Sequence, residues 1–345
     1  MSSETLPPSK LTPKPPRKLR IMSGCRTTSQ LHVGNYWGAV HNWLKLQDDP
    51  HNQCFFGVMD YHGLTTAYKS AGEIQHFNRD IYADLLAWGL DPEKNVIFIQ
   101  SQVPQHVELF MHFANLTPMG WLERVPTWKD AEEESKANDT HNLGRFSYPV
   151  LMAADVAVYF GNYIPVGADQ VAHLELTREI IRRFNHLYKG KIPEPQPLLT
   201  EAPLVPGLDG RKMSKSYGNG LLLTEEEKTL KKKVNSMLTD SKRARREDPG
   251  NPDDCTVYTF HKLYSSEEDK KWVVHGCTTA TIGCGDCKAK LCANIEAKTK
   301  IPREKKKELL NNPKTLDSII AAGCEKARTE ASKNLEQIKD WMKLK

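Results

Sequence analysis

The chain has 345 residues, of which 39% are hydrophobic and 26% charged, the composition of an ordinary globular protein with room for two domains. It holds no run of about 18 apolar residues, which excludes a transmembrane helix and argues against a membrane partner. The formal net charge of +5 is compatible with a nucleic-acid partner without requiring one.

Residues 1–18 carry five prolines and several basic side chains, and they lack the apolar segment of a secretory signal. We interpret them as a disordered, basic, proline-rich tail. In the absence of an export signal, we expect the eight cysteines to be reduced thiols or metal ligands rather than disulfides.

From residue 19 onward, short apolar runs alternate with segments of helical periodicity. Strands are predicted at 19–23, 54–60, 95–101 and 164–166, and helices at 34–44, 74–90, 155–160 and 170–187. Continuous apolar strands that alternate with helices are typical of a parallel sheet covered on both faces. The pattern therefore predicts an α/β fold with a Rossmann-type parallel sheet over residues 19–215.

The character of the chain changes after about residue 203. Residues 206–220 are rich in glycine, serine and lysine and have no periodicity, which predicts a mobile loop. Beyond Thr224, which with the three glutamates after it resembles a helix N-cap and first turn, the chain is charged and helix-prone. Helices are predicted at 302–310 and 316–342. Residues 216–345 are therefore expected to form a second, mainly helical domain.

Two short motifs carry the chemistry. His32-Val33-Gly34-Asn35 stands at the predicted turn from the first strand to the first helix, and Lys212-Met213-Ser214-Lys215-Ser216 stands in the late loop. Each string alone recurs by chance, but the two in this order and context are specific. An imidazole at a helix start donates a hydrogen bond to a phosphate, and Gly34 lets a nucleotide approach the backbone closely. Lysines on a loop neutralise a departing phosphate group in the transition state.

These motifs resemble the HIGH and KMSKS signatures of class I aminoacyl-tRNA synthetases. Four longer segments, at residues 23–39, 148–155, 166–170 and 248–255, are similar to motifs of the tryptophanyl-tRNA synthetases. The resemblance extends from about residue 19 to the C-terminus. It implies activation of tryptophan with ATP and its transfer to tRNA(Trp), with Mg2+ accompanying ATP. It also implies a homodimer in a bacterial cytoplasm and an anticodon-binding role for residues 216–345.

The resemblance also assigns roles to individual residues. The catalytic residues would be His32, Asn35, Lys212 and Lys215. The ATP site would add Arg26, Gly34, Gly167, Asp169, Met213, Ser214 and Ser216. Tryptophan would contact Met22, Tyr148, Met152, Asp155, Val166 and Gln170. Asp155 matches the carboxylate that accepts the indole N–H, and such a group is a physically sensible selector because phenylalanine would leave it unpaired.

The chain departs from the family pattern at two places. Thr27-Thr28-Ser29 replaces Pro-Thr-Gly, so backbone flexibility near the ATP site is expected to differ. The family places a catalytic lysine near residues 129–136, and either Lys129 or Lys136 fits that role. A solvated surface loop is the alternative for this segment.

Four cysteines have the spacing of a metal site. Cys255, Cys277, Cys284 and Cys287 are separated by 21, 6 and 2 residues, and the last pair forms a Cys-x-x-Cys motif. Four thiolates suit a 4Fe–4S cluster, which a subset of the bacterial family carries on a similar spacing, or a zinc ion. Free thiols are the remaining alternative, and Cys292 is a spare.

Two basic clusters, at residues 231–233 and 242–246, are either tRNA-phosphate contacts or solvated helix faces. Two rival functions are a tyrosyl-tRNA synthetase and a paralogue that binds tRNA or senses tryptophan without charging. A tyrosyl-tRNA synthetase has both motifs but selects a phenol, and the block at 148–155 favours tryptophan. A binding-only paralogue would not need His32, Gly34, Asn35, Lys212 and Lys215 intact.

Overall fold

The computed structural model of the chain describes residues 19–126, 128, 141–167, 171–199, 205–213 and 217–344. The tail predicted at residues 1–18 lies outside this range. So do Lys129, Lys136, Asp169, Gln170, Ser214, Lys215 and Ser216, to which the sequence assigned functional roles.

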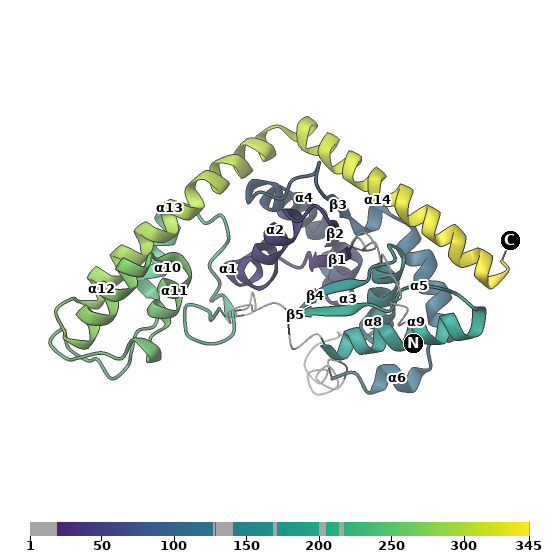
Figure 1. Ribbon diagram of the computed structural model, residues 1–345. Helices are drawn as coiled ribbons and strands as arrows, with labels where there is room; N and C mark the ends of the chain where they lie inside the picture. The colour runs from purple at the N-terminus through teal and green to yellow at the C-terminus, as the bar shows by residue number, and fades with distance from the viewer. Residues whose placement is uncertain are drawn as a thin grey trace, which may run out of the picture.

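A twisted sheet of parallel strands forms the centre of the first half of the chain (Figure 1). Its strands, within the described residues, are β1 (Leu19–Arg26), β2 (Asn52–Met59), β3 (Val96–Ile99), β4 (Tyr163–Val166) and β5 (Gln196–Leu199). Their order is β3-β2-β1-β4-β5, and every neighbouring pair is parallel. This order, with helices on both faces, confirms the predicted Rossmann-type α/β fold.

The helices of this half connect the strands. They are α1 (Val33–Asn35), a π-helical turn η1 (Tyr36–Val40), α2 (His41–Gln47), α3 (Asp60–Ala67), α4 (Ala71–Ala87), α5 (Gln105–Leu116), α6 (Met119–Glu123), α8 (Leu143–Ala157) and α9 (Val171–Tyr188). Single 3-10 turns lie at η2 (Tyr68–Ser70) and η3 (Gln100–Gln102). The helix predicted at 155–160 is the end of α8, which begins at Leu143 under an N-cap from the Asn142 side chain.

The second half is helical, as predicted. It contains α10 (Glu227–Ser236), a 3-10 turn η6 (Pro252–Asp254), α11 (Thr256–Tyr264), α12 (Glu267–Thr278), α13 (Cys284–Asn311) and α14 (Pro313–Met342). Figure 1 shows α13 and α14 as two long arms that meet at an angle, with α10, α11 and α12 gathered at the far end of α13. Helix α13 runs through Pro302, where the sequence predicted a helix start.

Thr224 does not cap α10. The helix begins at Glu227 with Glu226 as its N-cap residue, and the Thr224 hydroxyl donates instead to Asp84 at 3.2 Å. The N-cap prediction is therefore wrong, because a buried carboxylate of α4 offers this hydroxyl a partner outside its own helix.

Helix α14 packs against the sheet rather than against α10–α12. Gly323 lies so close to β3 that a Cβ there would stand 2.1 Å from the carbonyl oxygen of Ile97. The amide of Ile99 donates to Cys324 Sγ at 3.3 Å, and Asn334 donates to the carbonyl of Val158 at 2.9 Å. Leu316, Ile320 and Ala327 accordingly belong to the core of the sheet.

A second hydrophobic core unites parts that are distant in sequence. It includes Val33 of the first signature, Met213 of the second, and buried side chains of α10, α11 and α13 such as Leu230, Phe260 and Leu291. The predicted division of the chain at 215/216 stays a prediction, since both cores contain residues from each side of that boundary. Among the described helices, none has the length and apolar character needed to cross a bilayer.

Candidate active site

The candidate site lies at the edge of the sheet where the parallel strands end. Arg26 closes β1, Asp60 follows β2, Gln100 follows β3 and Val166 closes β4. The carboxyl ends of parallel strands share one edge, and in open α/β sheets ligands bind there. Of the residues that the sequence assigned to ATP and tryptophan, Arg26, Val166 and Gly167 lie at this edge.

His32 is fixed as the N-cap residue of α1. Its Nδ1 accepts from the amide of Asn35 at 3.3 Å, while Asn35 Oδ1 accepts from the amide of His32 at 3.0 Å. Burial lowers the pKa of His32, so the imidazole is neutral at neutral pH. Because Nδ1 acts as an acceptor, the proton is carried by Nε2. The ring therefore presents an N–H donor on the side away from the helix.

Gly34 makes room for this imidazole. A Cβ at Gly34 would stand 3.0 Å from Nδ1 and 3.1 Å from Cε1 of His32. The sequence predicted that this glycine admits a nucleotide to the backbone, and the structure adds that it leaves room for the His32 side chain of its own motif.

The second signature lies against the first. Met213 is buried, and its Sδ is 3.7 Å from the position of a Cβ at Gly34. The chain that leaves this signature also pairs with the first: the amide of Val33 donates to the carbonyl of Leu221 at 2.9 Å. Lys212 is exposed beside the site. The structure thus brings together the described parts of both motifs.

Asn219 cross-links the described parts of the loop that carries the second signature. Its Nδ2 donates to Asp209 Oδ1 at 2.7 Å and to the carbonyl of Lys212 at 3.2 Å. Its carbonyl accepts from the amide of Leu208 at 2.8 Å, and a Cβ at Gly207 would stand 2.2 Å from its Nδ2. The mobile loop that the sequence predicted here stays a prediction, and these contacts connect its described parts.

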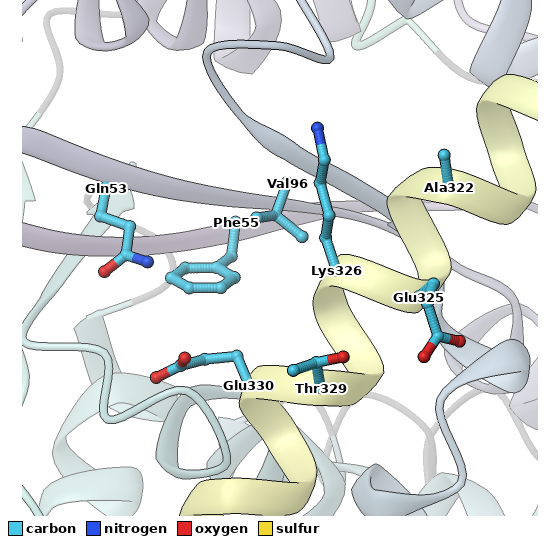
Figure 2. A pocket seen from close by; sticks show the side chains of 8 residues that line it. All are labelled: Gln53, Phe55, Val96, Ala322, Glu325, Lys326, Thr329 and Glu330. Atoms are coloured by element: carbon cyan, nitrogen blue, oxygen red, sulfur yellow. The ribbon is translucent and has the colours of Figure 1, made fainter.

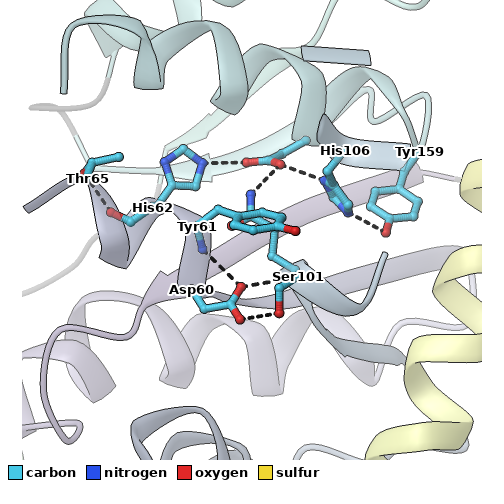
Figure 3. A network of polar contacts seen from close by, with 9 residues as sticks. Asp60, Tyr61, His62, Thr65, Ser101, His106 and Tyr159 are labelled. Atoms are coloured by element: carbon cyan, nitrogen blue, oxygen red, sulfur yellow. Dashed lines mark hydrogen bonds and ion pairs between the residues drawn. The ribbon is translucent and has the colours of Figure 1, made fainter. Parts of the chain in front are cut away.

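Asp155 is the centre of a buried polar network that includes His62 and His106, both labelled in Figure 3. Its Oδ2 is 2.7 Å from His62 Nε2, and its Oδ1 is 2.8 Å from Gln100 Nε2 and 2.7 Å from His106 Nδ1. Only 2% of Asp155 is exposed. Burial opposes ionisation, but the two imidazoles outweigh it and hold the pKa of Asp155 below its ordinary value. The group is therefore a carboxylate at neutral pH.

Four other residues assigned to tryptophan lie on the helix of Asp155 or on two neighbouring strands. Tyr148 and Met152 precede it by two turns and one turn on α8, so the three share a helix face. Met22 and Val166 are buried on the neighbouring strands β1 and β4. Tyr148 Oη is held 2.5 Å from His173 Nε2.

The residues assigned to ATP are placed in part. Arg26 lies at the end of β1, and its Nη2 donates to Thr66 Oγ1 at 2.7 Å. Gly167 directly follows β4 and is half-buried.

Sequence reasoning missed the partners of Asp155, namely His62, Gln100 and His106, and it missed Tyr159, which contacts His106. One signal was available: polar residues follow two buried strands directly, Asp60 after β2 and Gln100 after β3. Asp60 itself is structural. It accepts from the amide of Ser101 at 2.9 Å and from Asn78 at 2.9 Å, and so joins the ends of β2 and β3 (Figure 3).

The four cysteines of the predicted metal site converge from three helices. Cys255 precedes α11, Cys277 lies in the last turn of α12, and Cys284 and Cys287 occupy the first turn of α13. The thiol of Cys287 interacts electrostatically with the other three. Yet among the described residues no three His, Cys, Asp or Glu side chains are arranged to hold a metal ion. The structure therefore does not confirm the metal prediction.

Several side chains of the basic clusters have internal partners. Lys233 donates to Glu225 at 2.5 Å, and Lys242 lies 3.1 Å from Asp254. Arg243 donates to two backbone carbonyls at 2.7 Å. Lys231 and Lys232 are exposed on α10.

A separate hollow lies between α14 and the opposite edge of the sheet (Figure 2). Gln53 and Val96, at the starts of β2 and β3, line it together with Lys326 and Glu330 of α14. Glu330 forms a 2.7 Å ion pair with Arg20. The hollow is thus part of the seam that fastens α14 to the sheet, remote from the candidate site.

Comparisons with known proteins agree with this geometry. Residues 14–299 match the family model of class I tRNA synthetases (W and Y). The tryptophan–tRNA ligase of Thermotoga maritima is 46% identical over 94% of this chain and 99% of its own length, and that of Aquifex aeolicus is 37% identical over 94% and 100%.

Solved structures point the same way. A crystal structure of tryptophanyl-tRNA synthetase from Campylobacter jejuni, complexed with ADP and tryptophan, has a TM-score of 0.85 and 34% identity over 93% of this chain and 99% of that one. A tyrosyl-tRNA synthetase from Archaeoglobus fulgidus, with a TM-score of 0.64 and 17% identity, shares the fold alone. The chain belongs to the class I aminoacyl-tRNA synthetases and, within them, to the tryptophan–tRNA ligases.

Proposed function

We propose that this chain activates L-tryptophan with ATP, forming tryptophanyl-adenylate and pyrophosphate, and then transfers the tryptophanyl group to tRNA(Trp). The observation that carries the proposal is the contact between the two signatures. Val33 of the first motif bonds to Leu221, just beyond the second motif, and Met213 packs beside Gly34. A buried carboxylate, Asp155, stands at the same edge of the sheet.

At the ATP end, the reaction needs positioning and charge rather than a protein nucleophile. A carboxylate oxygen of tryptophan attacks the α-phosphorus, and the bond to pyrophosphate breaks. His32 Nε2–H donates to a phosphate oxygen, and Lys212 with Lys215 neutralises the departing pyrophosphate. Mg2+ accompanies ATP and offsets the same negative charge. Arg26, Gly34, Asn35, Gly167, Asp169, Met213, Ser214 and Ser216 complete the proposed ATP site.

At the tryptophan end, Asp155 accepts the indole N–H, while Met22, Met152 and Val166 contact the ring. Tyr148 and Gln170 hold the amino-acid end. A site built to bond an N–H rejects phenylalanine by roughly 10⁴–10⁵, because the buried carboxylate would be left without that partner. Tyrosine would place a phenol, not a ring N–H, at this carboxylate.

In the second step, a hydroxyl of the terminal ribose of the tRNA attacks the carbonyl carbon of the adenylate, and AMP leaves. We place anticodon binding in the helical part of the chain, residues 216–345, as the sequence predicts. The exposed Lys231 and Lys232 offer charge to tRNA phosphates, which supports this assignment.

We further propose that the protein acts as a homodimer in the cytoplasm. Exposed apolar side chains on α5 and α6 support a dimer: Val107 is 41% exposed, Met111 57% and Met119 66%. A second copy of the chain would cover this surface. A molecular mass in solution equal to one chain, at micromolar concentration, would contradict the dimer.

The four cysteines Cys255, Cys277, Cys284 and Cys287 are proposed to hold a 4Fe–4S cluster, with zinc as the alternative. The convergence of four thiols from three helices supports this assignment. The group would organise the anticodon-binding surface and would take no part in the chemistry of activation.

Amino-acid-dependent exchange between ATP and pyrophosphate tests the first step, with tryptophan, tyrosine, phenylalanine or no amino acid. Exchange with tryptophan alone is expected. Exchange with tyrosine would point to a tyrosyl enzyme and overturn the role of Asp155. Tryptophan binding without any exchange, by folded protein, would favour the binding-only paralogue.

A further inference from the structure

The two oxygens of Asp155 are not equivalent. A carboxylate has about four acceptor positions, two on each oxygen. Oδ1 accepts from Gln100 Nε2 at 2.8 Å and from His106 Nδ1 at 2.7 Å, so both of its positions are filled. Oδ2 accepts from His62 Nε2 at 2.7 Å. Within the described residues, one acceptor position therefore stays open, and it belongs to Oδ2.

His106 fills its position on Oδ1 only if its proton is on Nδ1. The other ring nitrogen, Nε2, lies 2.9 Å from Tyr159 Oη. Burial raises the pKa of Tyr159 well above its usual value, so the phenol keeps its proton. In the described residues Tyr159 Oη has no other hydrogen-bond partner, and its O–H donates to Nε2. A ring nitrogen that accepts a bond carries no proton, and the proton of His106 therefore resides on Nδ1.

Both rings are held rigidly. His106 and Tyr159 have no exposed surface. Phe98 stacks on His106 with centroids 5.4 Å apart, and Phe55 stacks on Tyr159 with centroids 4.5 Å apart. The imidazole and the phenol thus form a fixed relay from the core to the carboxylate (Figure 3).

We propose that Tyr159, acting through His106, is a positioning residue for tryptophan selection: it keeps Oδ1 saturated and so directs the indole N–H to the single open position on Oδ2. The inference rests on the proposed function and extends it to a residue that does not touch the substrate. Without the Tyr159 hydroxyl, His106 can carry its proton on Nε2. Its Nδ1 lone pair then faces Oδ1, and the carboxylate loses its fixed orientation.

The test compares two substrates that differ at one atom, tryptophan and its analogue with sulfur in place of the indole N–H (benzothienylalanine). Exchange between ATP and pyrophosphate is measured for the unmodified protein and for Tyr159→Phe. The matched control is Tyr82→Phe, since Tyr82 is equally buried but donates to the carbonyl of Ile97 at 3.0 Å, outside the network.

Tyr159→Phe is expected to raise KM for tryptophan about ten- to a hundredfold, the range for one unsatisfied buried partner. The kcat with tryptophan and the KM for the sulfur analogue should stay within about threefold, so the preference for the N–H substrate falls. Tyr82→Phe should keep the preference of the unmodified protein. Equal preference in the two variants would overturn the inference, and so would an equal rise of both KM values.

A second pair of variants avoids dependence on the folding of Tyr159→Phe. His106→Asn places an amide N–H where Nδ1 stands, whereas His106→Leu removes the donor. The preference for tryptophan over the sulfur analogue should be retained in His106→Asn and lost in His106→Leu. An equal preference in these two variants would contradict the relay. Absence of tryptophan-dependent exchange in the unmodified protein is a different result, because it rejects the proposed function itself.

Discussion

His32 and Leu222 face each other across an antiparallel β-bridge. Hydrogen bonds of 2.9 Å, from Val33 to the carbonyl of Leu221 and from Leu223 to the carbonyl of Leu31, close the bridge on both sides. The histidine of the first signature and the chain leaving the second are therefore one structural unit.

Replacing His32 with alanine should slow tryptophan-dependent exchange by about 10²–10³ in kcat, the usual effect of removing one donor aimed at transition-state charge. The KM for tryptophan should change little, since His32 is assigned to the phosphate. His51→Ala is the control, because that exposed ring pairs with Asp49 and, within the described residues, with no other side chain. A large rise in KM for tryptophan with normal kcat would contradict the assignment.

Gly34→Ala should reproduce much of this loss, because the new Cβ would stand 3.0 Å from His32 Nδ1 and displace the ring. Gly38→Ala provides a matched comparison four residues later: a Cβ there meets nothing within 4 Å. We expect kcat to fall at least about tenfold in the first variant and to stay near normal in the second. Equal activities would show that the imidazole tolerates displacement.

A buried charge cluster joins α4, α13 and the segment that follows Leu222. Lys306 Nζ lies 2.8 Å from Asp80 Oδ2 and 2.9 Å from Asp84 Oδ2. Two carboxylates thus share one ammonium group. Burial raises the pKa of Asp84 from its ordinary 3.8 to about 7, and the attraction of Lys306 only partly opposes this.

The raised pKa of Asp84 makes stability depend on pH. The folded state holds this proton more tightly than the unfolded chain does, so ionising Asp84 lowers the free energy of unfolding as the pH rises from about 4 to about 7. Asp84→Asn cannot ionise. Its free energy of unfolding, relative to the unmodified protein, should therefore rise by a few kcal/mol between pH 5 and pH 8. Urea titrations at these pH values measure the difference, and a pH-independent difference would refute the assignment.

Lys306→Met should have the opposite effect on stability: its free energy of unfolding, relative to the unmodified protein, should fall as the pH rises. It leaves Asp80 and Asp84 without their shared cation, which typically costs about 3–5 kcal/mol for a buried pair. The cost should be larger at pH 8 than at pH 5, where Asp84 binds its proton. The same urea titrations apply, and a loss below about 1 kcal/mol at pH 8 would show that water, rather than Lys306, compensates the carboxylates.

The cysteine proposal predicts a metal content. Protein purified without oxygen should contain iron and sulfide with a broad visible absorbance, or zinc in the alternative case. Cys284→Ser should lose most of this metal. Cys292→Ser, on the same helix and packed against the second core, should keep it. Unmodified protein free of iron and zinc would remove both forms of the proposal.

The fold could be predicted, and the two signatures recognised, because both depend on short local patterns in the sequence. Apolar runs that end in glycine or a polar residue predicted β1, β2 and β3, and helical periodicity predicted α4 and α9. The contact between Met213 and Gly34 was not predicted, because it joins two segments that are far apart in the sequence.

Contacts between distant segments could not be read from such patterns. His62, Gln100 and His106 stand on three different elements, and only the parallel order of the strands brings them to Asp155. The sequence predicted a helix where α14 lies, but no local pattern indicates that Gly323 lets this helix pack directly on the backbone of β3. The long helix α13 continues through Pro302, although a proline inside a helix removes a backbone hydrogen bond and usually marks a helix end.

We propose above all that the two contacting signatures and Asp155 make the protein specific for one amino acid, tryptophan, and one tRNA, tRNA(Trp). The most direct measurement is aminoacylation of tRNA(Trp) and tRNA(Tyr) transcripts, each offered tryptophan or tyrosine with ATP and Mg2+. We predict tryptophan on tRNA(Trp) and no charging in the other three combinations. Tyrosine on either transcript, or no charging of tRNA(Trp) by protein that exchanges pyrophosphate with tryptophan, would contradict the claim.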